Sequence, residues 1–185
     1  MRFKRKKRGF LTNLSLITIT YLGQTPPKFL IAHTLFYFTK PHDLILDPMA
    51  GGGVVPDVCL LFERKCQAFD LSPGGDKRPE IEHHHWNPQN RTWPVTKKPD
   101  LIFFDPPYYT KKQKEYEKKA TTTTPSISSY TKRNYERFFK DFFTLAHENS
   151  KPATTLAFLN AGETYSRHHR KNTAYSQKEI KNPYP

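Results

Sequence analysis

A short apolar run that leads straight into a glycine-rich turn constrains the fold of this chain most. Residues 44–46 (Leu-Ile-Leu) have the length and composition of a strand buried on both faces of a parallel sheet. The turn over residues 47–53 ends in three consecutive glycines, and the apolar spacing of residues 54–62 predicts a helix that packs back on the sheet. A strand, a glycine-rich turn and a helix in this order begin a β-α-β unit.

The same alternation of apolar runs and helical patterns continues along the chain. Further strands are expected over residues 66–70, around residue 81, and over residues 101–104 and 156–159, with helices over residues 29–38 and 135–147. This alternation predicts an α/β fold with a parallel sheet. Phe138, Phe139, Phe142 and Phe143 follow the helical spacing of the last helix, so we expect them in the core.

Composition divides the chain into three parts. Residues 1–24 are a basic arm and lead-in, residues 25–162 form the folded domain, and residues 163–185 form a polar tail that we expect to be disordered. Residues 111–129 combine a dense charge run with a Thr/Ser-rich stretch, which predicts one long polar loop inside the domain. A length of 185 residues, of which 36% are apolar, suits one such domain with a core of its own.

An excess of positive charge indicates a polyanionic partner. Thirty Lys and Arg residues against seventeen Asp and Glu residues give a net charge of +13, which favours nucleic acid. No apolar run in the sequence approaches the ~20 residues of a membrane span, so no membrane partner is expected. Two cysteines, Cys59 and Cys66, are too few for a disulfide framework, which is typical of a cytoplasmic protein.

Two acidic residues stand where a nucleoside-binding sheet would use them. Asp47 opens the glycine-rich turn, and Asp70 ends the following strand. Their separation is close to the interval of about 20 residues at which an acidic side chain binds the ribose hydroxyls of an adenine nucleoside.

A second motif, Asp105-Pro106-Pro107-Tyr108, follows the strand over residues 101–104. It lies at the carboxyl end of that strand, which is where ligands bind in open α/β sheets. The adjacent prolines fix the backbone, so the Asp105 carboxylate and the Pro106 carbonyl can accept hydrogen bonds from an exocyclic amine. The ring of Tyr108 can stack on a flipped base.

Together these motifs resemble those of S-adenosylmethionine-dependent DNA amino-methyltransferases, which modify adenine N6 or cytosine N4. The resemblance covers about residues 25–160 and includes the segment Pro26-Pro27-Lys28-Phe29 before the glycine-rich turn. It implies a Rossmann-like class I methyltransferase sheet. It also implies cofactor binding by Asp47, Pro48, Met49, Gly51, Gly53 and Asp70, and base binding and catalysis by Asp105, Pro106, Pro107 and Tyr108.

The resemblance further implies that the target amine attacks the sulfonium methyl group in line, without a metal and without a covalent enzyme intermediate. The Asp105 carboxylate and the Pro106 carbonyl would orient the lone pair and stabilise the positive charge that develops on nitrogen. An Asp at the first position of the motif favours adenine N6 over cytosine N4, because cytosine enzymes of the family often carry Ser there.

Three features depart from the family pattern. Val54 and Val55 stand where Thr is frequent, and residues 83–86 (His-His-His-Trp) stand where an acidic residue commonly faces the cofactor adenine. This histidine run is not expected to bind a metal, because successive residues of a strand face opposite sides. Only 25 residues, most of them polar, follow position 160, where the family adds two strands. We therefore expect a sheet that is incomplete at the C-terminus, with a free edge that a second protein chain would cover.

These departures keep two alternatives to a DNA methyltransferase open. The first is a truncated or inactive remnant that binds nucleic acid without the cofactor. The second is an RNA amino-methyltransferase, because the motifs recognise an exocyclic amine rather than a sugar.

Overall fold

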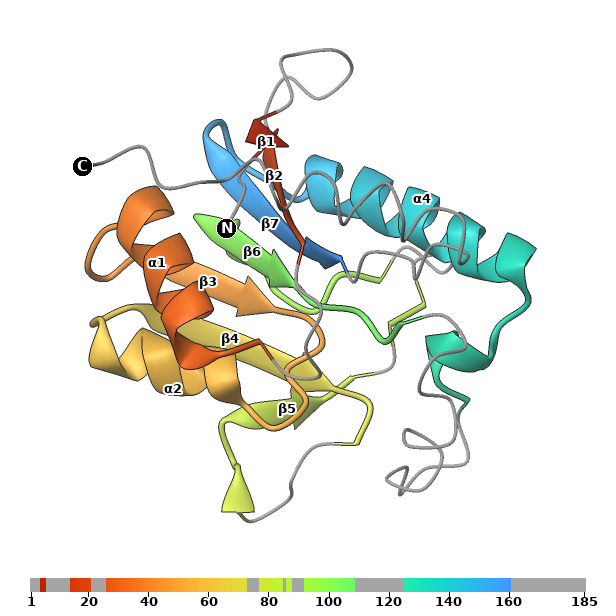
Figure 1. The fold of residues 1–185 in the computed structure, drawn as a ribbon, viewed down its shortest axis with the longest axis horizontal. Coiled ribbons are helices and arrows are strands. Elements are labelled where there is room, and N and C mark those ends of the chain that lie inside the picture. Colours follow the sequence, from red (N-terminus) through yellow and green to blue (C-terminus); the bar gives the residue numbers. More distant parts are fainter. Residues whose placement is uncertain are drawn as a thin grey trace, which may run out of the picture.

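One sheet organises the computed structural model of the chain (Figure 1). Its strands are β1 (Lys4–Arg5), β2 (Leu14–Thr20), β3 (Leu44–Asp47), β4 (Lys65–Asp70), β5 (Ile81–His83), β6 (Leu101–Phe104) and β7 (Thr154–Asn160). The helices are α1 (Lys28–Phe38), α2 (Val54–Leu61) and α4 (Lys132–Glu148), with a 3-10 turn η3 at Ile127–Ser129. The structure describes residues 4–5, 14–20, 26–72, 77–84, 86–87, 92–108 and 125–160. The predictions for most of the loop over 111–129 and for the tail over 163–185 lie outside these residues.

The strands pair in the order β1-β2-β7-β6-β3-β4-β5, and all neighbours except β1 and β2 run parallel. This arrangement confirms the α/β class and the parallel sheet that the sequence predicts. The strands and helices expected between residues 29 and 159 are all present, with ends that shift by at most three residues. None of the helices in the described part of the chain has the length and apolarity that crossing a membrane requires.

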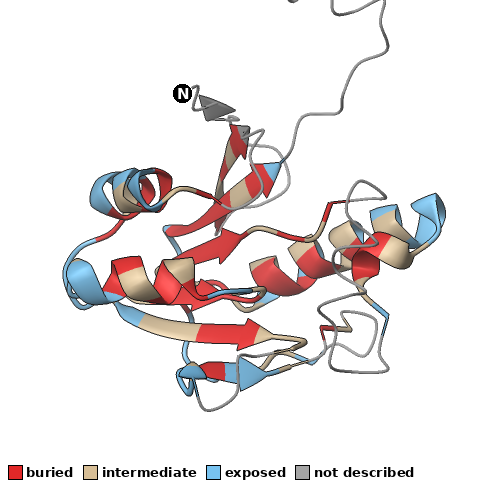
Figure 2. Ribbon diagram, turned by 60° about the horizontal axis from the view of Figure 1, so that its bottom comes forward, coloured by how far each residue is buried: buried red, intermediate tan, exposed pale blue. Residues whose placement is uncertain are grey.

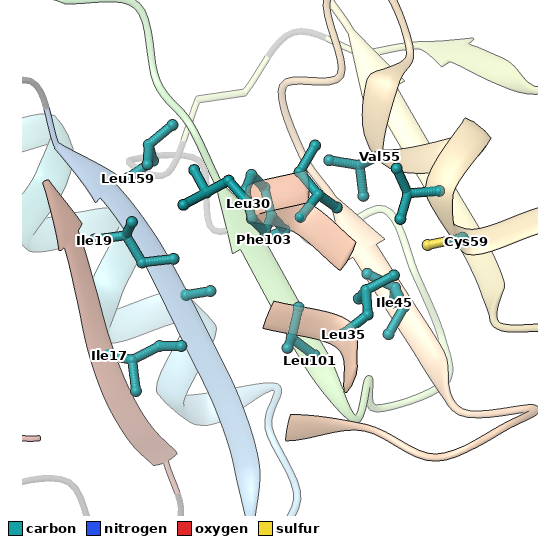
Figure 3. Packing of buried hydrophobic residues seen from close by; sticks show 13 residues of the cluster. Ile17, Ile19, Leu30, Leu35, Ile45, Val55, Cys59, Leu101, Phe103 and Leu159 are labelled. Atoms are coloured by element: carbon teal, nitrogen blue, oxygen red, sulfur yellow. The ribbon is translucent and has the colours of Figure 1, made fainter. Parts of the chain in front are cut away.

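Helices cover both faces of the sheet, with α1 and α2 on one face and α4 on the other (Figure 1). Successive residues of β6 alternate between them, since Leu101 and Phe103 pack toward α1 and α2, and Ile102 and Phe104 toward α4. Figure 2 shows the buried residues concentrated on the central strands and on the inward sides of the helices. Figure 3 shows the cluster beneath α1 and α2, which extends from β2 to α2.

Helix α4 buries an aromatic stripe on the sheet. Phe138 and Phe142 are buried, and the ring of Phe142 stacks on that of Phe104 with 4.0 Å between the centroids. Phe139 and Phe143 pack against the same cluster but stay partly exposed. The expected core position of the stripe is confirmed, with its outer two rings at the rim.

The sheet does not stop at β7, because β2 pairs with β7 in parallel along its whole length, from Leu14 beside Thr154 to Thr20 beside Asn160. Ile17 and Ile19 of β2 are buried in the cluster shown in Figure 3. The prediction of a free sheet edge beside the last strand is therefore wrong. An N-terminal segment supplies the missing strand, with β1 antiparallel outside it, so no second protein chain is needed at this position.

Candidate functional site

Three carboxyl groups gather where neighbouring strands of the sheet end. Asp47 is the last residue of β3, Asp70 is the last residue of β4, and Asp105 follows β6 directly. Strand β3 lies between β4 and β6. The chain runs from β3 through α2 to β4 on one side, whereas β6 lies on the other side. Such a reversal of strand order is the place where open α/β sheets bind their ligands.

Asp47 is the most buried of the three acids, with only 1% of its surface exposed. Its Oδ1 accepts a hydrogen bond of 3.3 Å from the backbone N–H of Met49, whereas its buried Oδ2 has no partner within the described ranges. Burial raises the pKa of Asp47 well above its ordinary value, and the nearby charges of Asp105 and Asp70 add to this shift. A buried acceptor without a partner costs free energy, so this oxygen suits a ligand that brings a donor or a positive charge.

The glycine turn between β3 and α2 has two residues in left-handed conformation. Gly51 has φ +54° and Gly53 has φ +81°, which residues with a Cβ rarely adopt. Hydrogen bonds fasten the turn to β4, from the N–H of Ala50 to the carbonyl of Phe69 at 2.8 Å and from the N–H of Gly51 to Asp70 Oδ2 at 2.9 Å. The backbone thus lies close to the carboxyl ends of β3 and β4.

The Asp70 carboxylate, which the sequence predicts to bind a ribose, accepts two hydrogen bonds from nearby backbone N–H groups. Its Oδ1 accepts the N–H of Ser72 at 2.8 Å, while Oδ2 accepts the N–H of Gly51. Each carboxylate oxygen can accept a second hydrogen bond, so these two bonds orient the group without using its full capacity. Of the other residues expected at the cofactor, Pro48 is buried and Met49 packs against the core on the α4 side, so both shape the turn by packing.

The Asp105-Pro106-Pro107-Tyr108 turn is braced from within and from α4. The Tyr108 hydroxyl donates to Asp105 Oδ1 at 3.4 Å, and the Tyr135 hydroxyl donates to the carbonyl of Pro107 at 2.9 Å. Pro106 is buried and Asp105 is partly exposed. Tyr108 has only 9% of its surface exposed, less than a ring that offers a full face to a base. The turn is therefore a rigid support that presents Asp105.

Arg78 is a residue near the site that the sequence analysis did not single out. Its guanidinium donates to the carbonyl oxygens of Gly52 at 2.6 Å and Gly53 at 2.9 Å. It also pairs with Asp57 Oδ1 at 3.0 Å and with Glu80 Oε1 at 2.5 Å. No sequence signal marks this role, because an arginine that contacts backbone carbonyls needs no particular residue type at the positions it contacts.

The segment expected to face a cofactor adenine contains aromatic residues. His83 is exposed, and the His84 ring contacts Phe69 and Trp86 edge-on. Trp86 is 4% exposed and in turn contacts Trp93. Residue 85 lies outside the described residues. Over the described ranges, no three His, Cys, Asp or Glu side chains form a group that could hold a metal ion.

Comparison with known proteins adds no relative to this picture. A scan against models of protein families finds no match, and a search of curated proteins finds no significant match. The residues and geometry at the carboxyl ends of the strands therefore carry the functional proposal.

Proposed function

We propose that this protein is a class I, Rossmann-like methyltransferase that transfers a methyl group from S-adenosylmethionine to the exocyclic amine of a DNA base, with adenine N6 preferred to cytosine N4. The observation that carries the proposal is the convergence of Asp47, Asp70 and Asp105 at the point where strand order reverses, beside a glycine turn. Each acid has a separate task in this proposal.

The residues around the turn fit the cofactor chemically. S-adenosylmethionine carries a sulfonium and an ammonium charge, and in a chain of net charge +13 this end of the sheet gathers acidic groups. Asp47 Oδ2, buried and without a partner among the described residues, suits a cationic group, and the oriented carboxylate of Asp70 suits ribose hydroxyls. When bound, the cofactor supplies an electrophilic methyl group.

Asp105 and Pro106 are the proposed acceptors for the target amine. Two acceptors on a rigid turn hold both amine hydrogens, which aims the nitrogen lone pair away from them and stabilises positive charge on nitrogen. The hydroxyl of Tyr108 keeps the Asp105 carboxylate in place from the neighbouring side. Because so little of the Tyr108 ring is exposed, stacking on a base would use only its accessible part.

The charge of the chain supports DNA as the substrate. Lys132 and Arg133 are exposed in the first turn of α4, the end of the helix that Tyr135 links to the Asp105 turn. Cations at this place suit the phosphates that flank a base at Asp105.

Titration calorimetry with S-adenosylmethionine tests the proposal without knowledge of the target sequence. We expect a dissociation constant in the micromolar range, about −8 kcal/mol. Asp70→Asn should weaken this binding, whereas Asp105→Asn should retain it and abolish transfer to DNA, measured by sequencing-based detection of methylated adenine.

Two outcomes would contradict this assignment. Equal loss of cofactor binding in both variants would contradict the separate roles of Asp70 and Asp105. A folded wild-type chain that binds DNA in a salt-sensitive manner but does not bind the cofactor would favour the nucleic-acid-binding remnant. Competition between DNA and RNA acceptors separates the DNA enzyme from an RNA amino-methyltransferase.

A further inference from the structure

Arg78 connects three parts of the chain at the glycine turn, and we infer that it is a positioning residue that sets the affinity of this site for S-adenosylmethionine. The inference rests on the proposed function and extends it to a residue outside both sequence motifs. Arg78 lies between the end of β4 and the start of β5, and it contacts the turn, helix α2 and Glu80.

The guanidinium group uses its planar set of donors on several acceptors at once. Nη1 reaches Gly52, Nη2 reaches both Gly53 and Asp57, and Nε reaches Glu80. The two glycine contacts are with backbone carbonyls, so Arg78 holds the path of the turn itself rather than a side chain on it. Lysine could reproduce only part of this arrangement, because an ammonium group is a point charge without a fixed fork of donors.

For electrostatic reasons, the contact of Arg78 with the glycine turn depends on the acidic residues Asp57 and Glu80. A cation near the N-terminus of a helix is unfavourable beside the partial positive charge of that end, and Gly53 is the N-cap of α2. Asp57 in the first turn and Glu80 both pair with the guanidinium, whose side chain is 25% exposed. These pairs offset the repulsion and leave the remaining donors for the carbonyls of the turn.

Arg78 also explains part of the requirement for glycine at position 53. A Cβ built on Gly53 would overlap the guanidinium of Arg78, in addition to the strain of its positive φ. Glycines lose more conformational freedom on ordering than other residues, so a turn with three of them is costly to order when a ligand binds. By ordering the turn beforehand, Arg78 reduces this cost and so strengthens binding.

Arg78→Met tests the inference, because it keeps an unbranched apolar chain and removes all the donors. The matched control is Arg137→Met, which removes an exposed arginine that pairs with Asp141 at 3.6 Å on α4. We expect at least a tenfold weaker affinity for S-adenosylmethionine in Arg78→Met, faster amide exchange at Gly51 and Gly53, and no change in the control. Arg78→Lys should recover part of the affinity, which a loss of general stability would not explain.

The outcomes separate this inference from the proposed function. If the wild type binds the cofactor and Arg78→Met binds equally well, the inference is wrong and the proposed function stands. If the wild type does not bind the cofactor, the proposed function itself is wrong. Should Arg78→Met fail to fold, Arg78→Lys carries the test: an affinity equal to that of the wild type at an unchanged melting temperature would overturn the inference.

Discussion

The hydroxyl of Tyr135 donates a hydrogen bond of 2.9 Å to the carbonyl oxygen of Pro107. This contact ties the N-terminal half of α4 to the turn that presents Asp105, although Pro107 and Tyr135 are 28 positions apart in the sequence. The aromatic stripe of α4 packs the helix on the sheet. The hydrogen bond therefore attaches the turn to a helix that the core holds in place.

Tyr135→Phe should lower the rate of methyl transfer about tenfold and leave cofactor affinity unchanged. The substitution keeps the ring contact with Phe139, at 4.8 Å between centroids, and removes one hydrogen bond worth about 1 kcal/mol of stability. Single-turnover kinetics and calorimetry measure the two effects. Tyr130→Phe, in a ring that packs against the same cluster, is the control. A parallel loss of rate and cofactor affinity would show that Tyr135 acts on the whole site.

Asp47→Asn should stabilise the fold, and increasingly so as the pH rises. The folded pKa of Asp47 is raised above its ordinary value of 3.8, mainly by burial and further by Asp105 and Asp70. At pH values between the ordinary pKa of 3.8 and the folded pKa, the native state binds more protons than the unfolded state. Wild-type stability therefore falls as the pH rises. Each unit of this shift corresponds to about 1.4 kcal/mol.

Urea unfolding of both proteins from about pH 4 to pH 8 measures the effect of Asp47. The difference in unfolding free energy should widen with pH and level off above the folded pKa of Asp47. Parallel profiles across the whole range would mean that Asp47 does not change its pKa on folding.

Alanine at the three glycines of the turn should destabilise the fold in the order Gly53, Gly51, Gly52. Gly53 combines a positive φ with overlap at Arg78, Gly51 has only the positive φ, and a Cβ on Gly52 would meet nothing within 4 Å. The left-handed conformation costs an alanine roughly 1–2 kcal/mol, and Gly53→Ala should exceed that. Denaturant midpoints measure the order, with Gly52→Ala as the control. Equal effects at all three positions would contradict the conformations described.

Ile19→Ala should cost about 2–5 kcal/mol of stability, the usual penalty for truncating a buried isoleucine. Ile19 is 1% exposed in β2, so the prediction distinguishes an integral strand from a lead-in. Leu60→Ala, at a site that is 82% exposed, is the control. Thermal and urea unfolding give the measurement, and a neutral Ile19→Ala would mean that β2 is not part of the stable sheet.

Local pattern was sufficient to predict the centre of the fold. A few neighbouring residues are enough to identify each of its three segments, which are the apolar run over residues 44–46, the glycine turn and the apolar run over residues 101–104. They also place Asp47, Asp70 and Asp105 at strand ends. The structure brings these three acids close enough for their charges to interact.

The parts that the sequence did not predict depend on contacts between distant segments. The apolar run of strand β2 is interrupted by Ser15, Thr18 and Thr20, and its partner β7 lies near the other end of the described chain, so no local pattern connects the two. The contacts of Arg78 with the glycine turn and of Tyr135 with Pro107 are with backbone carbonyls, which every residue has. Such contacts leave no periodicity or spacing in a single sequence.

The pairing of β2 with β7 has a consequence for how this protein is made. Leu14 lies beside Thr154, so the two strands meet only after nearly all of the intervening chain has left the ribosome. Until then Ile17 and Ile19 have no β7 neighbour to cover them, and closing so long a loop makes a late, slow step of folding. Strand β2 therefore lacks its partner until β7 has been synthesised, and during that interval it is exposed to chaperones and to pairing with other chains.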